Sequence, residues 1–238
     1  MQIQGLQKLT LLDYPEKVAA TVFTTGCNFR CPFCHNASLV MDVDARYDIP
    51  TGEVMSFLKK RKNVLEGVCI SGGEPLLQPD LEDFIKEVKS LGYLVKLDTN
   101  GSNLKKLQNL VEKSLIDYVA MDIKNAPSKY VVTIGLEKDT KNDCSEEVMS
   151  QILATVDYLK SGVVPYEFRT TVVREFHNRE DLEVIGQWLE GAEKYYLQEF
   201  VDSGDLIGEG FRAYTDDIME QALTIVRKYI PEAKMRGS

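Results

Sequence analysis

The chain has 238 residues, 44% of them hydrophobic, and its 28 Lys and Arg against 37 Asp and Glu give a formal net charge of −9. This length suits one large α/β domain or two small ones, and we expect a single domain over 1–238. The negative charge argues against nucleic acid and against a membrane surface as partners. No apolar run approaches the ~20 residues that a membrane helix needs. The first residues lack the pattern of a secretory signal, so we expect a cytoplasmic protein.

Residues 3–17 form a leucine-rich lead-in, and the β-rich run at 17–23 predicts the first strand. A loop follows with three cysteines in a C-x3-C-x2-C spacing: Cys27, Cys31 and Cys34. Gly26 and Pro32 keep this loop out of a regular helix, so the three sulfurs can converge on one inorganic centre. Thiolates are soft ligands that select iron–sulfur clusters, zinc or cuprous copper.

The number of cysteines in this loop is as informative as their spacing. A cluster of four irons normally takes four cysteines, one for each iron, so three cysteines leave one iron open. Catalytic metal sites keep such an open position, whereas structural sites close it. The alternative is a small zinc site, which would need a fourth protein ligand. His35 lies too close to Cys34 in sequence to be an obvious one.

After the loop, the sequence predicts a helix over 50–62 with Thr51 as its cap, and a short buried strand over 68–70. The turn Ser71-Gly72-Gly73-Glu74-Pro75 ends that strand. Glycines allow a ligand to approach the backbone closely, because no side chain stands in the way. The alternative is a plain turn between a strand and a helix.

Strands and helices then alternate regularly. The predicted strands are 94–98, 118–122, 166–173 and 195–200. The predicted helices are 80–90, 104–114, 145–160, 180–189 and 215–229, the last capped by Thr215. The polar segment 125–143 is predicted to be a loop or a small excursion. Six β–α units favour a parallel sheet with right-handed crossovers. Because six units cannot close as eight do, the expected fold is α/β, a partial (β/α)6 TIM-like barrel with parallel strands.

Polar residues gather at the carboxyl ends of the predicted strands, where β/α barrels place their active sites. Asp98 and Thr99 end the third strand, and Asp122 ends the fourth. Two carboxylates on neighbouring strand ends repel each other unless a cation lies between them, and such oxygen ligands suit a hard cation. The alternative is that Asp98 caps a turn and Asp122 pairs with Lys124.

Four further reactive or charged residues do not belong to these strand-end positions or to the cysteine loop. Arg169 lies in an apolar strand, where burying an unpaired guanidinium is costly, so we expect it to face the barrel interior and contact a carboxylate of a cofactor or of the protein. His177, in the loop after that strand, is expected to be solvated rather than catalytic. Cys69 is expected to pack as a small hydrophobe. Cys144 lies in polar sequence and receives no role.

The cysteine loop resembles a known family. Its spacing, with Phe33 just before the last cysteine and His35-Asn36 after it, resembles the radical S-adenosylmethionine (SAM) enzymes, and within them the activases of glycyl radical enzymes. The opening Gly5-Leu6-Gln7-Lys8-Leu9-Thr10-Leu11-Leu12-Asp13-Tyr14-Pro15 makes the resemblance closest to activases of the anaerobic (class III) ribonucleotide reductase. The length is similar to that of pyruvate formate-lyase activase.

The resemblance implies cofactors, a reaction and partners. In the family, three cysteines hold a 4Fe-4S cluster whose fourth iron binds SAM, and reductive cleavage of SAM gives a 5′-deoxyadenosyl radical. An activase uses this radical to abstract a hydrogen atom from one glycine of its partner, here most closely the anaerobic ribonucleotide reductase, with flavodoxin or ferredoxin as electron donor. The alternatives are a pyruvate formate-lyase-type activase, a radical SAM enzyme acting on a small molecule or peptide, and a non-catalytic metal-binding module.

The resemblance also implies roles for residues around SAM. Phe33 is implied to lie near the adenine. The backbone of Gly72 and Gly73, with the carboxylate of Glu74, is implied to meet the ammonium end of the methionine moiety.

The carboxylate end of SAM has its own implied residues. Lys124 matches a family lysine that neutralises this carboxylate, and Arg169 is a further candidate contact. Asp98, Thr99 and Asp122 match the position of a monovalent cation beside the same carboxylate in pyruvate formate-lyase activase.

Overall fold

The computed structural model describes residues 1–41, 43–136 and 145–237. The chain divides into two compact units. The first unit comprises Met1–Asn28, Ser38–Thr99 and Asn103–Ala120, and the second comprises Phe29–Ala37, Asn100–Ser102 and Met121–Ser238. The expectation of a single domain stays a prediction. Cys144 lies outside the described residues.

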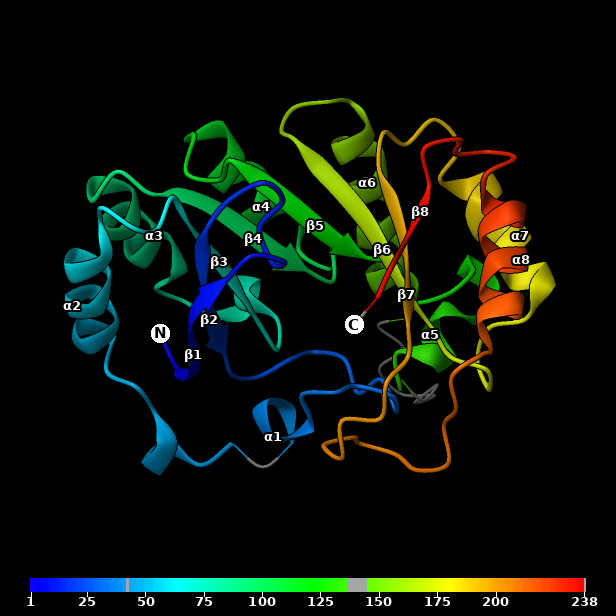
Figure 1. Ribbon diagram of the computed structural model, residues 1–238, viewed down its shortest axis with the longest axis horizontal. Helices are drawn as coiled ribbons and strands as arrows, with labels where there is room; N and C mark the ends of the chain where they lie inside the picture. The colour runs from blue at the N-terminus through cyan, green and yellow to red at the C-terminus, as the bar shows by residue number, and fades with distance from the viewer. Residues whose placement is uncertain (42, 137–144, 238) are drawn as a thin grey trace. The chain divides into compact units, whose positions relative to one another are not determined.

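The first unit is built on a sheet whose strands follow one another in chain order. Strand β1 is antiparallel to β2, whereas β2, β3 and β4 run parallel. Figure 1 shows the helices α2, α3 and α4 of this unit in cyan to green. The elements are β1 (Ile3–Thr10), β2 (Ala19–Thr24), α1 (Ala37–Val40), η1 (Ala45–Tyr47), α2 (Thr51–Arg61), β3 (Gly67–Gly72), η2 (Pro75–Leu77), α3 (Leu81–Ser90), β4 (Leu94–Thr99), α4 (Leu104–Glu112) and β5 (Tyr118–Asp122). The first residue of α1 and the last two residues of β5 already belong to the second unit.

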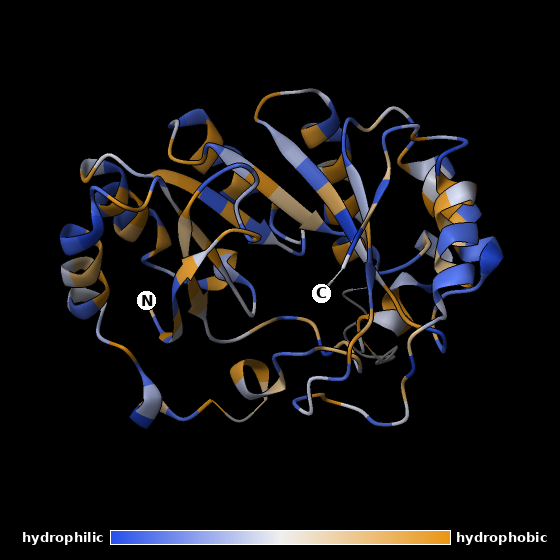
Figure 2. Ribbon diagram, viewed as in Figure 1, coloured by the Kyte–Doolittle hydropathy of each residue, from blue (hydrophilic) through white to orange (hydrophobic). Residues whose placement is uncertain are grey.

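Strands β2 and β3 are buried at most of their positions, which explains their largely apolar sequence. Val68, Cys69 and Ile70 of β3 are fully buried. Figure 2 shows hydrophobic colour along much of the strands β3, β4 and β5. Helix α3 buries one stripe at helical spacing, as predicted: Leu81, Phe84, Ile85 and Val88. Burial of this stripe holds the helix against the sheet.

In the second unit, β7 pairs in parallel with β6 and with β8. Helix α7 begins with a capping box formed by Asn178 and Asp181. Helices α7 and α8 lie side by side (Figure 1), and a Cβ added at Gly186 of α7 would meet the ring of Tyr229 at 2.7 Å. The elements are η3 (Pro127–Lys129), α5 (Tyr130–Thr133), α6 (Ser145–Lys160), β6 (Tyr166–Val172), α7 (Arg179–Trp188), β7 (Tyr195–Glu199), α8 (Asp216–Val226) and β8 (Lys234–Arg236).

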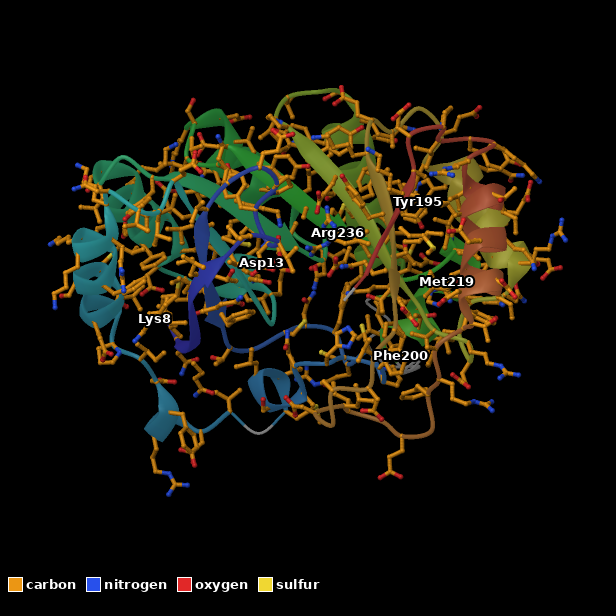
Figure 3. The ribbon with its side chains drawn as sticks, in the orientation of Figure 1. Lys8, Asp13, Tyr195, Phe200, Met219 and Arg236 are labelled. Carbon is orange, nitrogen blue, oxygen red and sulfur yellow. The ribbon has the colours of Figure 1, made fainter. Side chains whose placement is uncertain are left out.

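An ion pair adds to the pairing of the three-residue strand β8 with β7. Arg236, labelled on β8 in Figure 3, donates from its two terminal nitrogens to the carboxylate of Glu167 at 2.7 and 3.0 Å. Its guanidinium carbon lies 3.8 Å from the centroid of the Tyr196 ring. Glu167 is fully buried. Such bidentate pairs are the strong kind of charge-assisted hydrogen bond, so they can anchor a strand that is too short to anchor itself.

The α/β fold class with mainly parallel strands is confirmed, and each of the predicted strands and helices is present within a few residues of its expected bounds. Strands β1 and β8 were not predicted. Only the two end residues of β1 are buried, so its sequence lacks the apolar alternation of a strand. Strand β8 is too short to give a pattern.

Two predicted details of the helices are wrong or incomplete. The cap position of α2 is occupied by Pro50, which makes no side-chain hydrogen bond there, and Thr51 is already the first helical residue. Thr215 does occupy the cap position of α8, but its hydroxyl makes no capping hydrogen bond.

Within the segment 125–143, predicted as a loop or small excursion, the described residues include the short helix α5. Among the described residues, no helix combines the length and hydropathy needed to span a membrane.

Candidate functional site

The cysteine loop passes from the first unit into the second between Asn28 and Phe29. Cys27 therefore belongs to the first unit, whereas Cys31 and Cys34 belong to the second. Cys31 is buried, and the other two are partly exposed. All three are described residues, and none forms a disulfide.

In the first unit, the glycines of the Ser71–Pro75 turn pack against the end of β2. Gly72 has a φ of +117°, and a Cβ there would lie 2.2 Å from the carbonyl oxygen of Thr24. A Cβ at Gly73 would lie 2.0 Å from the carbonyl oxygen of Gly26. The backbone N–H groups of Gly73 and Glu74 donate to Thr24 and Gly26 at 2.9 and 2.8 Å. The glycines thus have a structural reason: they let this turn dock onto the start of the cysteine loop.

Glu74 is fully buried directly after these glycines. Its Oε1 accepts hydrogen bonds from the backbone N–H of Leu76 at 3.0 Å and from the hydroxyl of Thr99 at 2.9 Å. Two predicted site residues from separate strand ends, Glu74 and Thr99, therefore meet directly.

Two residues that sequence reasoning missed support the same turn. Lys106 of α4 donates from Nζ to the carbonyl oxygens of Leu76, at 2.8 Å, and of Gln78. Gln78 donates from its side chain to the carbonyl oxygen of Thr25 at 2.7 Å. Burial lowers the pKa of Lys106, opposed by the charge of Glu74. No sequence signal marks either residue, because both act on backbone carbonyls rather than through a motif.

Asp98 is the last residue but one of β4, and its carboxylate contacts Lys96 and Ser71 of its own unit. The ammonium of Lys96 forms an ion pair with its Oδ1, and the hydroxyl of Ser71 donates to its Oδ2 at 3.0 Å. The side chain of Lys96 has no exposed surface, and that of Asp98 is 13% exposed. Lys96 was not among the predicted site residues, because a lysine in a strand of mixed sequence is usually solvated.

In the second unit, Asp122, Lys124 and Arg169 form one charged cluster. Arg169 donates from Nε to Oδ1 of Asp122 at 2.9 Å, and Lys124 donates from Nζ to Oδ2 at 3.0 Å. The structure thus favours two of the weighed alternatives: Asp122 pairs with Lys124, and Arg169 contacts a carboxylate of the protein.

The charges in this cluster stabilise one another. Burial alone would raise the pKa of Asp122, but the cations Arg169 and Lys124 reverse this and lower it. Burial alone would lower the pKa of Lys124, but Asp122 and the thiolates of Cys31 and Cys34 raise it. Lys124 therefore stays charged and places a positive charge near two cysteines of the loop.

His177 is buried, with 1% of its surface exposed, so the expectation of a solvated histidine is wrong. The backbone N–H of Val173 donates to its Nδ1 at 3.1 Å, which leaves Nε2 to donate to the carbonyl oxygen of Lys124 at 2.8 Å. The short turn from Val173 to His177 folds the ring back onto the end of β6. Burial lowers the pKa of this imidazole.

Aromatic rings surround Phe33 in the second unit. Its ring centroid lies 5.0 Å from that of Phe176 and 6.3 Å from that of His177. Phe211 continues the cluster at 5.5 Å from Phe176, and Phe200 follows at 6.5 Å from Phe211. Figure 3 shows Phe200 at the end of β7. Phe33 is 3% exposed, so this cluster fixes the backbone between Cys31 and Cys34.

The segment after β7 also holds the cysteine loop. The backbone N–H of Gly208 donates to the carbonyl oxygen of Pro32 at 2.8 Å, and that of Ala37 donates to Asp205 at 3.3 Å. On another side, the N–H of Arg30 donates to the carbonyl oxygen of Ile134 at 2.8 Å.

The donor set suits an iron–sulfur cluster with one open iron, because it offers three soft thiolates in one loop and a lysine charge that offsets them. Across residues 1–41, 43–136 and 145–237, no group of three His, Cys, Asp or Glu side chains is already assembled around a metal position. Ligation by the three cysteines therefore rests on the motif.

Residues 21–189 match the Radical SAM superfamily. This match covers more than half of the chain and agrees with the α/β fold and the three-cysteine loop. The chain therefore belongs to that superfamily. Enzymes of this superfamily use a 4Fe-4S cluster and S-adenosylmethionine and are catalysts of the oxidoreductase type.

Two relatives narrow the comparison. The chain is 31% identical over 238 aligned residues to a protein of Methanocaldococcus jannaschii provisionally named a glycyl-radical enzyme activating enzyme, with 98% of this chain and 95% of that protein covered. It is 25% identical to the pyruvate formate-lyase-activating enzyme of Clostridium pasteurianum, over 82% of this chain and 85% of that protein. The chain is thus similar to glycyl-radical-enzyme activases.

Solved structures support the fold. SuiB of Streptococcus suis superposes with a TM-score of 0.68 at 13% identity, over 92% of this chain and 48% of SuiB. A domain of a pyruvate-formate lyase-activating enzyme from Bacteroides vulgatus gives a TM-score of 0.55 at 17% identity, over 72% of this chain and 99% of that domain.

Proposed function

We propose that this protein is a radical SAM activase that generates a glycyl radical on a partner enzyme, most closely the anaerobic ribonucleotide reductase. The observation that carries the proposal is the loop with Cys27, Cys31 and Cys34 in a chain that aligns with an activating enzyme over 98% of its length. When bound, the reduced cluster supplies one electron that splits SAM into methionine and a 5′-deoxyadenosyl radical, which takes a hydrogen atom from a glycine Cα of the partner.

The proposed role of the protein's own residues is to bind and orient the cluster and SAM. Cys27, Cys31 and Cys34 are the proposed cluster ligands. Lys124 is the proposed partner of the SAM carboxylate, since its charge lies near two of these thiolates. Arg169 supports Lys124 through their shared partner Asp122.

The first unit supplies the other proposed SAM contacts. Gly72 and Gly73 shape the turn, and Glu74 would take the ammonium group. Thr99 holds the carboxylate of Glu74 through its hydroxyl. Asp98 lies beside Thr99 at the end of β4. In the second unit, Phe33 is the proposed neighbour of the adenine.

The proposed donor of the electron is flavodoxin or ferredoxin. The test is electron paramagnetic resonance on a candidate glycyl radical enzyme incubated with this protein, SAM and reduced flavodoxin under anaerobic conditions. A doublet from a backbone glycyl radical supports the proposal. Production of 5′-deoxyadenosine without any such signal, across reductase and pyruvate formate-lyase partners, would contradict it.

A second candidate is a radical SAM enzyme acting on a small molecule or peptide. It is favoured by similarity to a GTP 3′,8-cyclase of Helicobacter pylori, which is 30% identical over 68% of this chain and 49% of that enzyme. The partial coverage makes this candidate the weaker one. Cleavage of SAM that is stimulated by a nucleotide, and not by a glycyl radical enzyme, would favour it.

A further inference from the structure

The predicted cation site does not fit the side chains that were expected to form it. A cation was expected from the repulsion of uncompensated carboxylates at Asp98 and Asp122, and the resemblance to pyruvate formate-lyase activase implied a monovalent one. Each carboxylate instead has a cationic side chain of its own unit as partner. Asp122 is paired with Lys124 and Arg169, and Asp98 is paired with Lys96.

The position of Lys96 follows from the register of the sheet. Cys69 on β3 lies opposite Lys96 on β4, so both side chains are on the same face, and Asp98 lies two residues further along that face. The ammonium nitrogen of Lys96 lies 3.9 Å from the sulfur of Cys69. The side chain of Lys96 therefore extends along one face of β4, and its ammonium reaches the carboxylate of Asp98 near the end of the strand.

Because Lys96 is buried, its ammonium needs a charged partner to stay protonated. Its side chain has no exposed surface, and a buried ammonium is costly unless it is paired and hydrogen-bonded. The carboxylate of Asp98 satisfies it, while Ser71 donates to the second carboxylate oxygen at 3.0 Å. Thr99, the other predicted cation ligand of this unit, directs its hydroxyl hydrogen to Glu74.

We propose that the ammonium of Lys96 is a built-in replacement for the monovalent cation, so that SAM binding by this protein does not depend on sodium or potassium. Lys96 is a positioning residue: it acts through Asp98, whose charge and orientation it fixes. The inference rests on the proposed function only for its SAM readout, because the stability of the chain reports the same charge without SAM.

The test compares three salts at equal ionic strength: choline chloride, sodium chloride and potassium chloride. For the wild-type protein, we expect the same SAM dissociation constant and the same melting temperature in all three, because general screening depends on ionic strength alone. A wild-type protein whose SAM affinity or melting temperature rises specifically in sodium or potassium would overturn the proposal.

Two variants test the replacement itself. Lys96→Met and Lys96→Gln leave the carboxylate of Asp98 without the ammonium, and we expect both to gain ion specificity. Sodium or potassium should then raise the melting temperature by roughly 2–4 °C relative to choline and tighten SAM binding. No ion-specific gain in either folded variant contradicts the proposal. If neither variant folds, the wild-type comparison decides.

Lys89→Met is the matched control. Lys89 forms a partly buried ion pair with Asp117 in the same unit at 2.7 Å. Loss of that pair should lower the melting temperature equally in all three salts. Failure of the glycyl radical assay would leave this result unchanged, because the melting temperature needs neither partner enzyme nor electron donor.

Discussion

The imidazole of His177 donates a hydrogen bond from Nε2 to the backbone carbonyl of Lys124 at 2.8 Å. Because the Val173 N–H donates to Nδ1, the ring is held as the neutral tautomer with the proton on Nε2. A residue expected in solvent thus fixes the backbone of the lysine proposed to bind SAM. The charged side chains that bear on this ring are Asp181 and Lys129, which are paired with each other at 2.7 Å.

This arrangement predicts how stability depends on pH. Burial lowers the pKa of His177, so the native protein resists protonation of a ring that the unfolded chain protonates near pH ~6.5. The contribution is complete above the unfolded pKa and is lost as the pH falls below it. We expect the urea midpoint of the apo-protein to fall on acidification, and to fall less in His177→Gln. His35→Gln measures the share of the other histidine, because the chain has two histidines and burial also lowers the pKa of His35. An equal acid response of wild type and His177→Gln would contradict the assignment.

The packing of Gly73 predicts a loss of stability that a change of ligand affinity cannot explain. A Cβ in Gly73→Ala would lie 2.0 Å from the carbonyl oxygen of Gly26, and neither backbone can yield easily. We expect a loss of about 1–3 kcal/mol in the free energy of unfolding, measured in urea without cofactors. Gly52→Ala in α2 is the control, because nothing lies within 4 Å of its added Cβ. The two variants should change stability in opposite directions, since alanine favours a helix.

The cysteine loop predicts a loss of chemistry without a loss of fold. Cys31→Ala should abolish production of 5′-deoxyadenosine from SAM under strong reductant, because the cluster loses one of three ligands. Iron bound after anaerobic reconstitution should fall in parallel. The urea midpoint of the apo-protein controls for unfolding and should change little. Retained 5′-deoxyadenosine production in this variant would falsify the cluster assignment.

The charged cluster of the second unit predicts strong coupling between Asp122 and Arg169. Asp122→Asn should destabilise the apo-protein by about 1–3 kcal/mol and weaken SAM binding, because two cations lose their shared carboxylate. In a double-mutant cycle with Arg169→Met, the combined variant should lose less stability than the sum of the single losses. Additive losses would show that the pair at 2.9 Å contributes little.

Much of the fold could be predicted from the sequence, because the buried parallel strands and amphipathic helices carry their own periodicity. Helix α3 illustrates this with four buried residues at helical spacing. Strand β1 could not be predicted, since an edge strand packed by its ends shows no alternation. Short elements such as α5 and β8 give too few residues for a period.

The candidate site was predictable where a motif fixes residue types, as in the cysteine loop and the turn at Gly72. Residues that act through long-range contacts were not predictable. Lys96, Lys106 and His177 each look solvated in their local sequence. Lys96 is buried where the sheet register places it opposite Cys69 of β3, and the partners of Lys106 and His177 come from other segments. The pairing of Asp122 with Arg169 also joins residues that are far apart in the sequence, and no local pattern encodes such a contact.

The hydrogen bonds that hold the cysteine loop have a consequence for how the enzyme is made. Arg30, Pro32 and Ala37 bond to Ile134, Gly208 and Asp205, which leave the ribosome long after the cysteines do. A nascent chain therefore carries its thiols without the backbone partners that order them. The backbone order of the loop therefore depends on residues as far along the chain as Gly208, so we expect the surroundings of the thiols to be completed late in synthesis.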